Sequence, residues 1–362
     1  MFLLVTRHLL LVTAFFMSES VQSIPPVFKS ETVYLPRVAS RPTAREWVRH
    51  AALFALTVLT TTLAGGMLAV NQAEIEPNLA VPAHWFDYAP YIPTYYALAL
   101  SNLIKYALVH PTLFAQGATF AAALLAILLA HESGHYIACR RYGVAATLPF
   151  FLPGPPGLGP GTFGAFIKIK SPIPTRRALF DIGVAGPLAG FAIIIPVAIV
   201  AVLTAHPEPT PINDATSGLV IFNDPPLLRL LAHLLHVSLD SVAFNPFYFA
   251  AWIGLLVTSL NLLPVGQLDG GHAVFAVLGA RVHKWIGRSA FLVMSLVAYL
   301  GWHWHGAPGG FIYAVLLFVM LRVRHPQAED EIEPLGRARQ LVALLTLAVF
   351  LLCFELFPLT IK

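Results

Sequence analysis

Long apolar stretches constrain this chain more than any other feature of its sequence. A helix that crosses the hydrocarbon core of a bilayer needs about 20 apolar residues, and stretches of that kind recur along most of the chain. Of the 362 residues, 57% are hydrophobic and only 11% are charged, and the mean hydropathy is +0.73. A soluble domain could not bury so much apolar surface, so the sequence predicts an all-α polytopic membrane protein.

We predict about seven transmembrane helices, preceded by a flexible, proline-containing arm at residues 1–45. Whether residues 1–17 form a signal, a span or an extension stays open. Residues 95–109 (YYALALSNLIKYALV) are interpreted as an interfacial or re-entrant helix, because a crossing there would change the side of every later loop. The expected spans lie at residues 48–70, 113–138, 180–204, 247–264, 289–304, 308–323 and 340–358.

Lysine and arginine residues predict the orientation of these spans. Four precede the first span, and six, three and four occupy the connections 139–177, 270–290 and 322–339. The alternate loops contain only Lys105 and Arg229. Because cytoplasmic loops are enriched in positive charge, the N-terminal arm is expected in the cytoplasm.

A polar motif, LLAHESGH, ends one of the apolar stretches at residues 128–135. His131 and His135 are four residues apart, so on a helix they share one face and can converge on a single ion. Glu132 follows the first histidine, as in HExxH zinc hydrolases, where this glutamate takes a proton from water instead of binding the metal. The alternative is that both histidines are ordinary buried polar residues. The membrane setting disfavours it, because ionisable residues there are costly and generally functional.

A catalytic zinc ion takes three protein ligands, and Asp269 in NLLPVGQLDGGH (residues 261–272) is the best third candidate. Counted from the outer surface, Asp269 lies about as far along its apolar segment as His131 lies along its own. The two side chains are therefore expected at similar depth in the membrane. Pro264, Gly266, Gly270 and Gly271 are expected to break the helix around the aspartate and let it turn inward. The alternative is that Asp269 caps a cytosolic helix that begins near His272.

Together, HESGH and NLLPVGQLDGG resemble the site-2 protease family of intramembrane zinc metalloproteases, whose pattern is HExxH followed by N-x-x-P-x-x-x-L-D-G. The segment GTFGAFIKIKSPIPTRRALFDIGVAGPLAG (residues 161–190) is similar to the branch without a PDZ domain. Cyanobacteria, other bacteria and plant plastids share that branch, which includes the plant ethylene-dependent gravitropism-deficient and yellow-green proteins. The resemblance covers about residues 46–325.

The resemblance implies one zinc ion per chain, held by His131, His135 and Asp269, with Glu132 activating water. It also implies that Asn261 positions the substrate or stabilises the oxyanion. Ser133 and Gly266 depart from residues common in the family, although neither departure removes a ligand. Residues 46–362 would then form a transmembrane metalloprotease domain with a catalytic core at about 111–272.

Several segments near these motifs carry further expectations. Alternation in TFGAFIKIK (residues 162–170) indicates a strand, and the preceding FLPGPPGLGPG cannot be a regular helix, so we expect a membrane-associated β-hairpin near the active site whose edge pairs with an extended substrate. Gly183, Gly186 and Gly190 are spaced for close backbone approach, and Asp181 is expected as a helix N-cap or dipole partner. His272 is a candidate for a side chain that supports a metal ligand from behind. His303 and His305, between tryptophans, favour an interfacial aromatic belt over a second metal site.

The function predicted from these residues is hydrolysis of peptide bonds within or near transmembrane segments. The expected partners are single-span membrane protein substrates and the lipid bilayer, with no nucleic acid. A catalytically silent metal-binding scaffold and a metal transporter are the alternatives. The bacterial inner membrane is the expected location, with a plastid membrane as the alternative, and the sequence does not indicate an oligomeric state.

Overall fold

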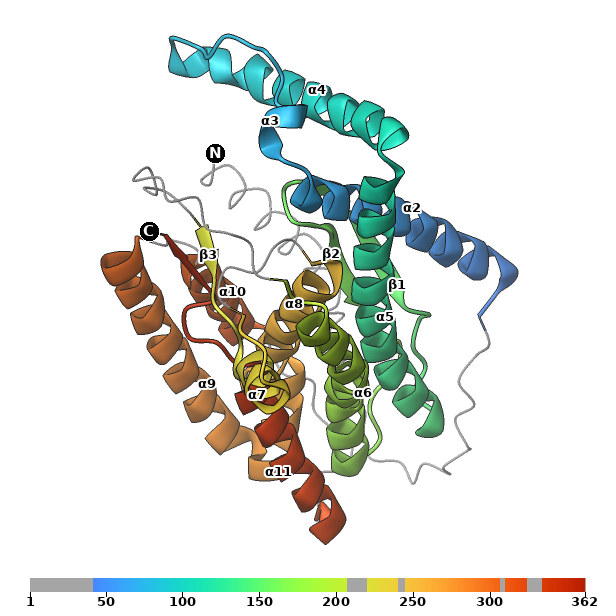
Figure 1. Ribbon diagram of the computed structural model, residues 1–362. Helices are drawn as coiled ribbons and strands as arrows, with labels where there is room; N and C mark the ends of the chain where they lie inside the picture. The colour runs from blue at the N-terminus through green and yellow to red at the C-terminus, as the bar shows by residue number, and fades with distance from the viewer. Residues whose placement is uncertain (1–41, 207–219, 240–244, 307–309, 324–333, 362) are drawn as a thin grey trace.

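Helices dominate the chain in the computed structural model, which describes residues 42–206, 220–239, 245–306, 310–323 and 334–361 (Figure 1). The predicted N-terminal arm lies almost entirely outside the described residues. The helices are α2 (Ala44–Ala69), α3 (Gln72–Ile75), α4 (Tyr88–Val109), α5 (Pro111–Arg141), α6 (Arg176–Leu203), α7 (Pro226–Leu235), α8 (Pro246–Asn261), α9 (Asp269–His305), α10 (Gly310–Arg322) and α11 (Gly336–Cys353), with a 3-10 turn η2 (Trp85–Asp87). The strands are β1 (Phe150–Pro156), β2 (Pro160–Phe166), β3 (Val220–Phe222) and β4 (Leu359–Ile361).

Five of the described helices are long and apolar enough to cross a membrane: α2, α5, α6, α9 and α11. They overlap five of the seven expected spans, although α11 ends at Cys353, before the end of the span expected at 340–358. The other two, 247–264 and 308–323, correspond to α8 and α10, which have 16 and 13 residues. At ~1.5 Å per residue, α8 is only about 24 Å long, shorter than a hydrocarbon core of about 30 Å. The structure therefore establishes a helical membrane protein, while the count of seven spans is not confirmed.

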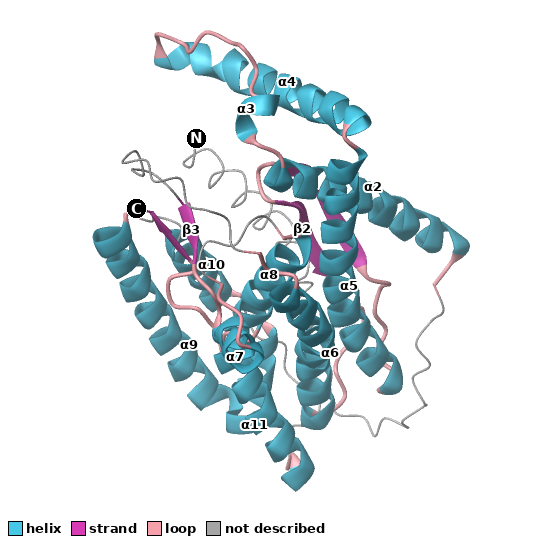
Figure 2. Cartoon of the chain, viewed as in Figure 1, coloured by secondary structure: helices cyan, strands magenta, loops and turns pink. Residues whose placement is uncertain are grey.

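The predicted hairpin is present, with a shifted boundary. β1 and β2 pair antiparallel, Phe150 opposite Phe166, and an isolated bridge joins Ala146 to Ile169. The second strand thus covers Pro160–Phe166 instead of residues 162–170, and the proline-rich FLPGPPGLGPG forms the first strand and the turn. Figure 2 shows the hairpin, in magenta, beside α2 and α5.

Helix α2 supports this hairpin directly. The Thr43 side chain and Glu46 form a capping box that starts the helix, and further along the Thr60 hydroxyl donates a hydrogen bond to the carbonyl of Gly161 (2.7 Å). Gly161 has φ +78° and lies so close to the Thr60 carbonyl that a Cβ atom would overlap it. The hairpin can therefore approach α2 only with glycine at this position.

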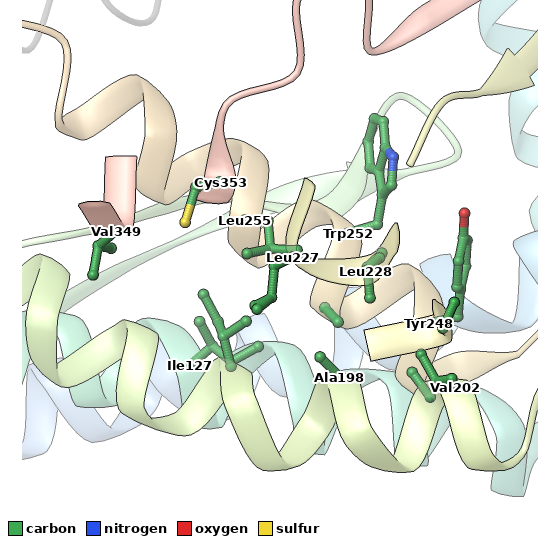
Figure 3. Packing of buried hydrophobic residues seen from close by; sticks show 14 of the residues in the cluster. Ile127, Ala198, Val202, Leu227, Leu228, Tyr248, Trp252, Leu255, Val349 and Cys353 are labelled. Atoms are coloured by element: carbon green, nitrogen blue, oxygen red, sulfur yellow. The ribbon is translucent and has the colours of Figure 1, made fainter. Parts of the chain in front are cut away.

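The largest apolar core lies where α5, α6, α7, α8 and α11 meet (Figure 3). Because lipid is as apolar as these side chains, close packing between them, more than transfer out of water, stabilises the association. This core packs together α5, α6 and α8, the helices around the site. Its labelled members are Ile127, Ala198, Val202, Leu227, Leu228, Tyr248, Trp252, Leu255, Val349 and Cys353.

The segment expected as an interfacial or re-entrant helix is part of α4, a continuous helix that begins earlier than predicted, at Tyr88. With α3 it lies at one end of the molecule, beyond α2 (Figure 1). Leu103 is buried in a small cluster with Val70, Ile75 and Leu113. The position of α4 in a bilayer stays a prediction.

Candidate metal centre

Helix α5 carries both motif histidines on its inner face. Their spacing of four residues places one a turn above the other, and the two Nε2 atoms lie 3.1 Å apart. Both side chains are buried. Helix α5 ends at Arg141, so His131 lies about 15 Å inside that end by helical rise. The basic pair Arg140 and Arg141 in the last turn also suits the negative end of the helix dipole.

Asp269 reaches the same point from the opposite side of the site. Its Oδ2 lies 3.2 Å from His131 Nε2 and 3.3 Å from His135 Nε2. Helix α8 ends at Asn261, a short irregular segment follows, and Asp269 is the first residue of α9, with Leu268 in the N-cap position. The predicted match in depth between Asp269 and His131 is therefore confirmed.

One detail of the predicted helix break was wrong. Gly270 and Gly271 do not interrupt a helix; they are in the first turn of α9, packed so tightly on the carbonyls of Leu262 and Gly266 that a Cβ would overlap them. Gly266, with φ +55°, supplies the left-handed turn before it. The alternative, that Asp269 caps a helix beginning near His272, does not hold, because α9 begins at Asp269 itself and Leu268 occupies the N-cap position.

The three donor atoms fit a metal ion. His131 Nε2, His135 Nε2 and Asp269 Oδ2 are separated by 3.1, 3.2 and 3.3 Å. Donors about 2.0–2.1 Å from a tetrahedral ion are about 3.3 Å from one another. Among the described residues, this is the group of three His, Cys, Asp or Glu side chains that could hold an ion.

A backbone contact prepares His135 to bind. Its Nδ1 lies 2.7 Å from the carbonyl oxygen of Ile182 in α6. A carbonyl only accepts hydrogen bonds, so Nδ1 carries the proton and, in the neutral ring, Nε2 keeps its lone pair for a metal. This carbonyl has no signature in the sequence, so no motif could have predicted it.

Three glycines of α6 make room for the site, as predicted from their spacing. A Cβ at Gly186 would overlap the His135 ring, one at Gly190 would lie 3.2 Å from the Cβ of His131, and one at Gly183 would lie 2.8 Å from the Cβ of His272. The spacing of three and four residues keeps them on one face of α6. Close approach of α6 to α5 at Gly186 and Gly190, and to α9 at Gly183, thus depends on the absence of side chains at these positions.

The two predicted catalytic residues lie beside the metal-binding group. Glu132 is buried, and its carboxylate accepts a hydrogen bond from the backbone of Ile167, just beyond β2. Asn261, the last residue of α8, places its Nδ2 3.3 Å from His131 Nε2. The structure brings all five predicted site residues together, while their roles in catalysis stay predictions.

Asp181 was predicted wrongly as an N-cap. Thr175 caps α6, through a bond from the Ala178 amide to its hydroxyl (3.1 Å). Asp181 lies in the second turn, where its carboxylate accepts two hydrogen bonds from Arg339 (2.8 and 2.7 Å) and one from the Tyr142 hydroxyl. Burial, and next the bond to Asp181, raise the pKa of Tyr142. Apolar length alone had placed the start of the helix too late.

The remaining predicted residues have smaller consequences. The Cβ of His272 packs on Gly183, and its support of a metal ligand stays a prediction. His303 and His305 lie in the last turn of α9, where Trp302 and Trp304 are exposed and His303 stacks on Tyr299. The surroundings are aromatic, as predicted, and their place at a membrane interface is untested.

Comparison with known proteins connects this geometry to a family. The profile "Peptidase family M50" matches residues 119–300, which include all five predicted site residues. The chain is 32% identical over 243 residues to "Probable zinc metalloprotease EGY1, chloroplastic" of Oryza sativa subsp. japonica, covering 65% of this chain and 40% of the relative. It is 30% identical over 242 residues to the Arabidopsis thaliana protein of the same name, covering 65% and 42%.

The chain spans about two fifths of the length of these curated relatives. Among solved structures, the "Site-2 Protease from Methanocaldococcus jannaschii" is similar with a TM-score of 0.34 and 19% sequence identity. That alignment covers 67% of this chain and 92% of the other.

Proposed function

Because this chain belongs to peptidase family M50, the site-2 protease family, we propose that it is an intramembrane zinc metalloprotease that hydrolyses peptide bonds within or near transmembrane segments. The observation that carries the proposal is the convergence of His131, His135 and Asp269 within 4.8 Å, in a bundle of apolar helices. Ionisable groups are costly in such a place and are expected there only for function.

Zinc is the metal best suited to this donor set. Two imidazole nitrogens and one carboxylate oxygen are common ligands of catalytic zinc, which keeps a fourth position open. Relatives from rice and Arabidopsis are named as probable zinc metalloproteases. When bound, the ion supplies Lewis acidity to the scissile carbonyl and to the attacking water.

The chemistry assigned to the protein begins with Glu132. Its carboxylate would take a proton from the attacking water and deliver it to the leaving nitrogen of the cleaved bond. Burial in an apolar surrounding keeps this proton transfer away from bulk solvent. Asn261 lies beside the His131 ring, close enough for its amide to donate a hydrogen bond to a substrate oxygen and hold it in position.

We assign the substrate a site along the β1–β2 hairpin. Proteases act on extended chains, whereas a membrane helix satisfies its own amides, so a strand edge beside the site offers an unwound segment new hydrogen-bond partners. The backbone contact between Ile167 and Glu132 places the end of β2 next to the general base. The Gly- and Pro-rich segment 153–161, which includes the turn of the hairpin, is then a candidate gate for water. Single-span membrane proteins are the proposed substrates.

The proposed topology has seven crossings and a cytoplasmic N-terminal arm. It relies on the concentration of Lys and Arg in alternate connections, and it requires α8 and the segment that follows it to span together. We place the protein in a bacterial inner membrane. The relatives named above are chloroplastic, so a plastid membrane is the alternative.

The test compares cells that produce wild-type protein with cells that produce Glu132→Gln. The variant should retain zinc, because Glu132 is not a ligand, and should accumulate uncleaved single-span proteins in the membrane proteome. Glu74→Gln, an exposed glutamate outside the site, is the matched control and should behave as wild type. Cleavage that persists in Glu132→Gln would remove Glu132 as general base and favour the scaffold or transporter alternative.

A further inference from the structure

Three side chains meet near the C-terminal end of α5 and the N-terminal ends of α6 and α11. Arg339, in the first turn of α11, donates from Nε and Nη2 to the two carboxylate oxygens of Asp181 in α6 (2.8 and 2.7 Å). The same Nη2 lies 3.1 Å from the hydroxyl of Tyr142, the C-cap residue of α5, and that hydroxyl donates to Asp181. We call Tyr142, Asp181 and Arg339 the helix clasp.

The position of the helix clasp suggests a role beyond stability. Arg339 and Asp181 are each 29% exposed, and ion pairs that water reaches contribute little to folding. Asp181, however, directly precedes Ile182, whose carbonyl accepts the hydrogen bond from His135 Nδ1. Tyr142 follows His135 by seven residues, about two helical turns. The helix clasp therefore joins the two segments that determine the orientation of the His135 ring.

Neighbouring contacts hold the same end of α6 from both sides. Arg176 binds the carbonyls of Ala276 and Val277 in α9, and Arg177 donates to the carbonyl of Pro334 just before α11 (3.0 Å). Leu335 is buried in an apolar cluster with residues of α5, α6 and α9. The start of α11 is thus packed onto the base of the metal-binding helices, although it lies outside residues 119–300 that the family profile matches.

We propose that Arg339, Asp181 and Tyr142 are positioning residues for the metal centre. They hold the Ile182 carbonyl against His135 Nδ1 and so set the tautomer and ring orientation of a metal ligand from α11, a helix that contributes no ligand itself. Partners of this kind behind a ligating histidine commonly change metal affinity 10–100-fold. The inference relies on the metal site of the proposed function, but not on proteolysis.

The experiment uses the full-length protein in detergent with Co²⁺ as the probe. The d–d absorption of bound Co²⁺ reports the geometry of its ligands. Arg339→Ala and Asp181→Asn should each weaken Co²⁺ binding about 10-fold and alter the absorption spectrum. The double variant should lose little more than either single variant, because both remove one interaction. Arg337→Ala is the matched control, an exposed arginine two residues earlier in the same helix, and should match wild type.

A second variant keeps the test decisive if Arg339→Ala does not fold. Tyr142→Phe retains the ring and removes only the hydroxyl, and a smaller change of the same kind is expected in Co²⁺ affinity and spectrum. Thermal unfolding is measured in parallel. A lower Tm with unchanged Co²⁺ affinity and spectrum would show a purely structural contact and overturn the inference alone. A wild-type protein that binds neither Co²⁺ nor Zn²⁺ would instead overturn the proposed function, and the inference with it.

Discussion

The two halves of the metal centre are built in contrasting ways. His131 and His135 project from the C-terminal half of α5, an uninterrupted helix of 31 residues. Asp269 lies at a junction where α8 ends, seven residues turn irregularly, and α9 begins. In α5, helical periodicity alone brings two donor atoms together. At the junction between α8 and α9, one donor atom is positioned by a turn that neighbouring segments stabilise.

The contrast shows that a regular helix and an irregular junction together position the donor atoms of one metal site. On α5 the two donors cannot separate without breaking helical hydrogen bonds, so their geometry is a local property. At the junction, Gly266 contacts the Met320 carbonyl in α10, and Gly270 lies against Leu262. The position of Asp269 therefore depends on packing against a distant helix. Polar, irregular backbone of this kind is tolerated in a membrane protein where other protein segments cover it.

Among the variants that test these two halves, those that remove a ligand should lower metal binding most. His135→Ala and Asp269→Ala each leave two donors, so zinc content measured by mass spectrometry on purified protein should fall to background and metal affinity by more than ~100-fold. The exposed His84→Ala is a control that should retain zinc. If Asp269→Ala bound zinc as tightly as wild type, the junction would not be half of the site.

Gly186→Ala should cause the next largest loss of metal affinity, and it tests the α5 half of the site. The added methyl group would overlap the His135 ring, and overpacking of this kind costs about 1–3 kcal/mol, so metal affinity should fall about 10-fold or more. Gly190→Ala is the matched control in the same helix, because its Cβ would lie 3.2 Å from His131 and calls for a smaller adjustment. Equal chelator competition curves for the two variants would contradict the assigned contact.

Gly266→Ala tests the junction half and should mainly lower stability. Alanine at φ +55° costs roughly 1–2 kcal/mol, and its Cβ would also overlap the Met320 carbonyl. Gly306→Ala, at φ +61° with nothing within 4 Å of its Cβ, isolates the backbone strain. Thermal unfolding should show a larger loss of Tm for Gly266→Ala, together with weaker zinc binding that Gly306→Ala does not share.

Ile167→Pro should have the smallest effect, on activity alone. Proline removes the backbone N–H beside Glu132, and one hydrogen bond is worth about 1 kcal/mol, or about fivefold in cleavage rate. Ile167→Ala keeps the N–H and serves as the control. Cleavage by Ile167→Pro at the wild-type rate would argue against the contact between Ile167 and Glu132, on which the placement of the substrate along the hairpin rests. Zinc content should be the same in both variants.

Much of the site could be predicted because its residues carry strong local signals. HExxH at helical spacing, glycines at three- and four-residue intervals in α6, and the alternation beyond Gly161 each predicted the structure that is found. The errors concerned helix ends. Asp181 was placed at the start of a span because apolar length marks only the part of a helix that lipid surrounds, whereas α6 begins five residues earlier at Arg176.

What the sequence determined by itself was the class of protein, the identity of the donors and the face of α5 on which two of them lie. These follow from composition and from a period of 3.6 residues, which need no knowledge of other segments. Only the tertiary structure decided how Asp269 reaches the histidines, which carbonyl contacts His135, and that Arg339 of α11 pairs with Asp181 beside that carbonyl. Those contacts join residues 47 to 158 positions apart, and no local pattern encodes a meeting over such distances.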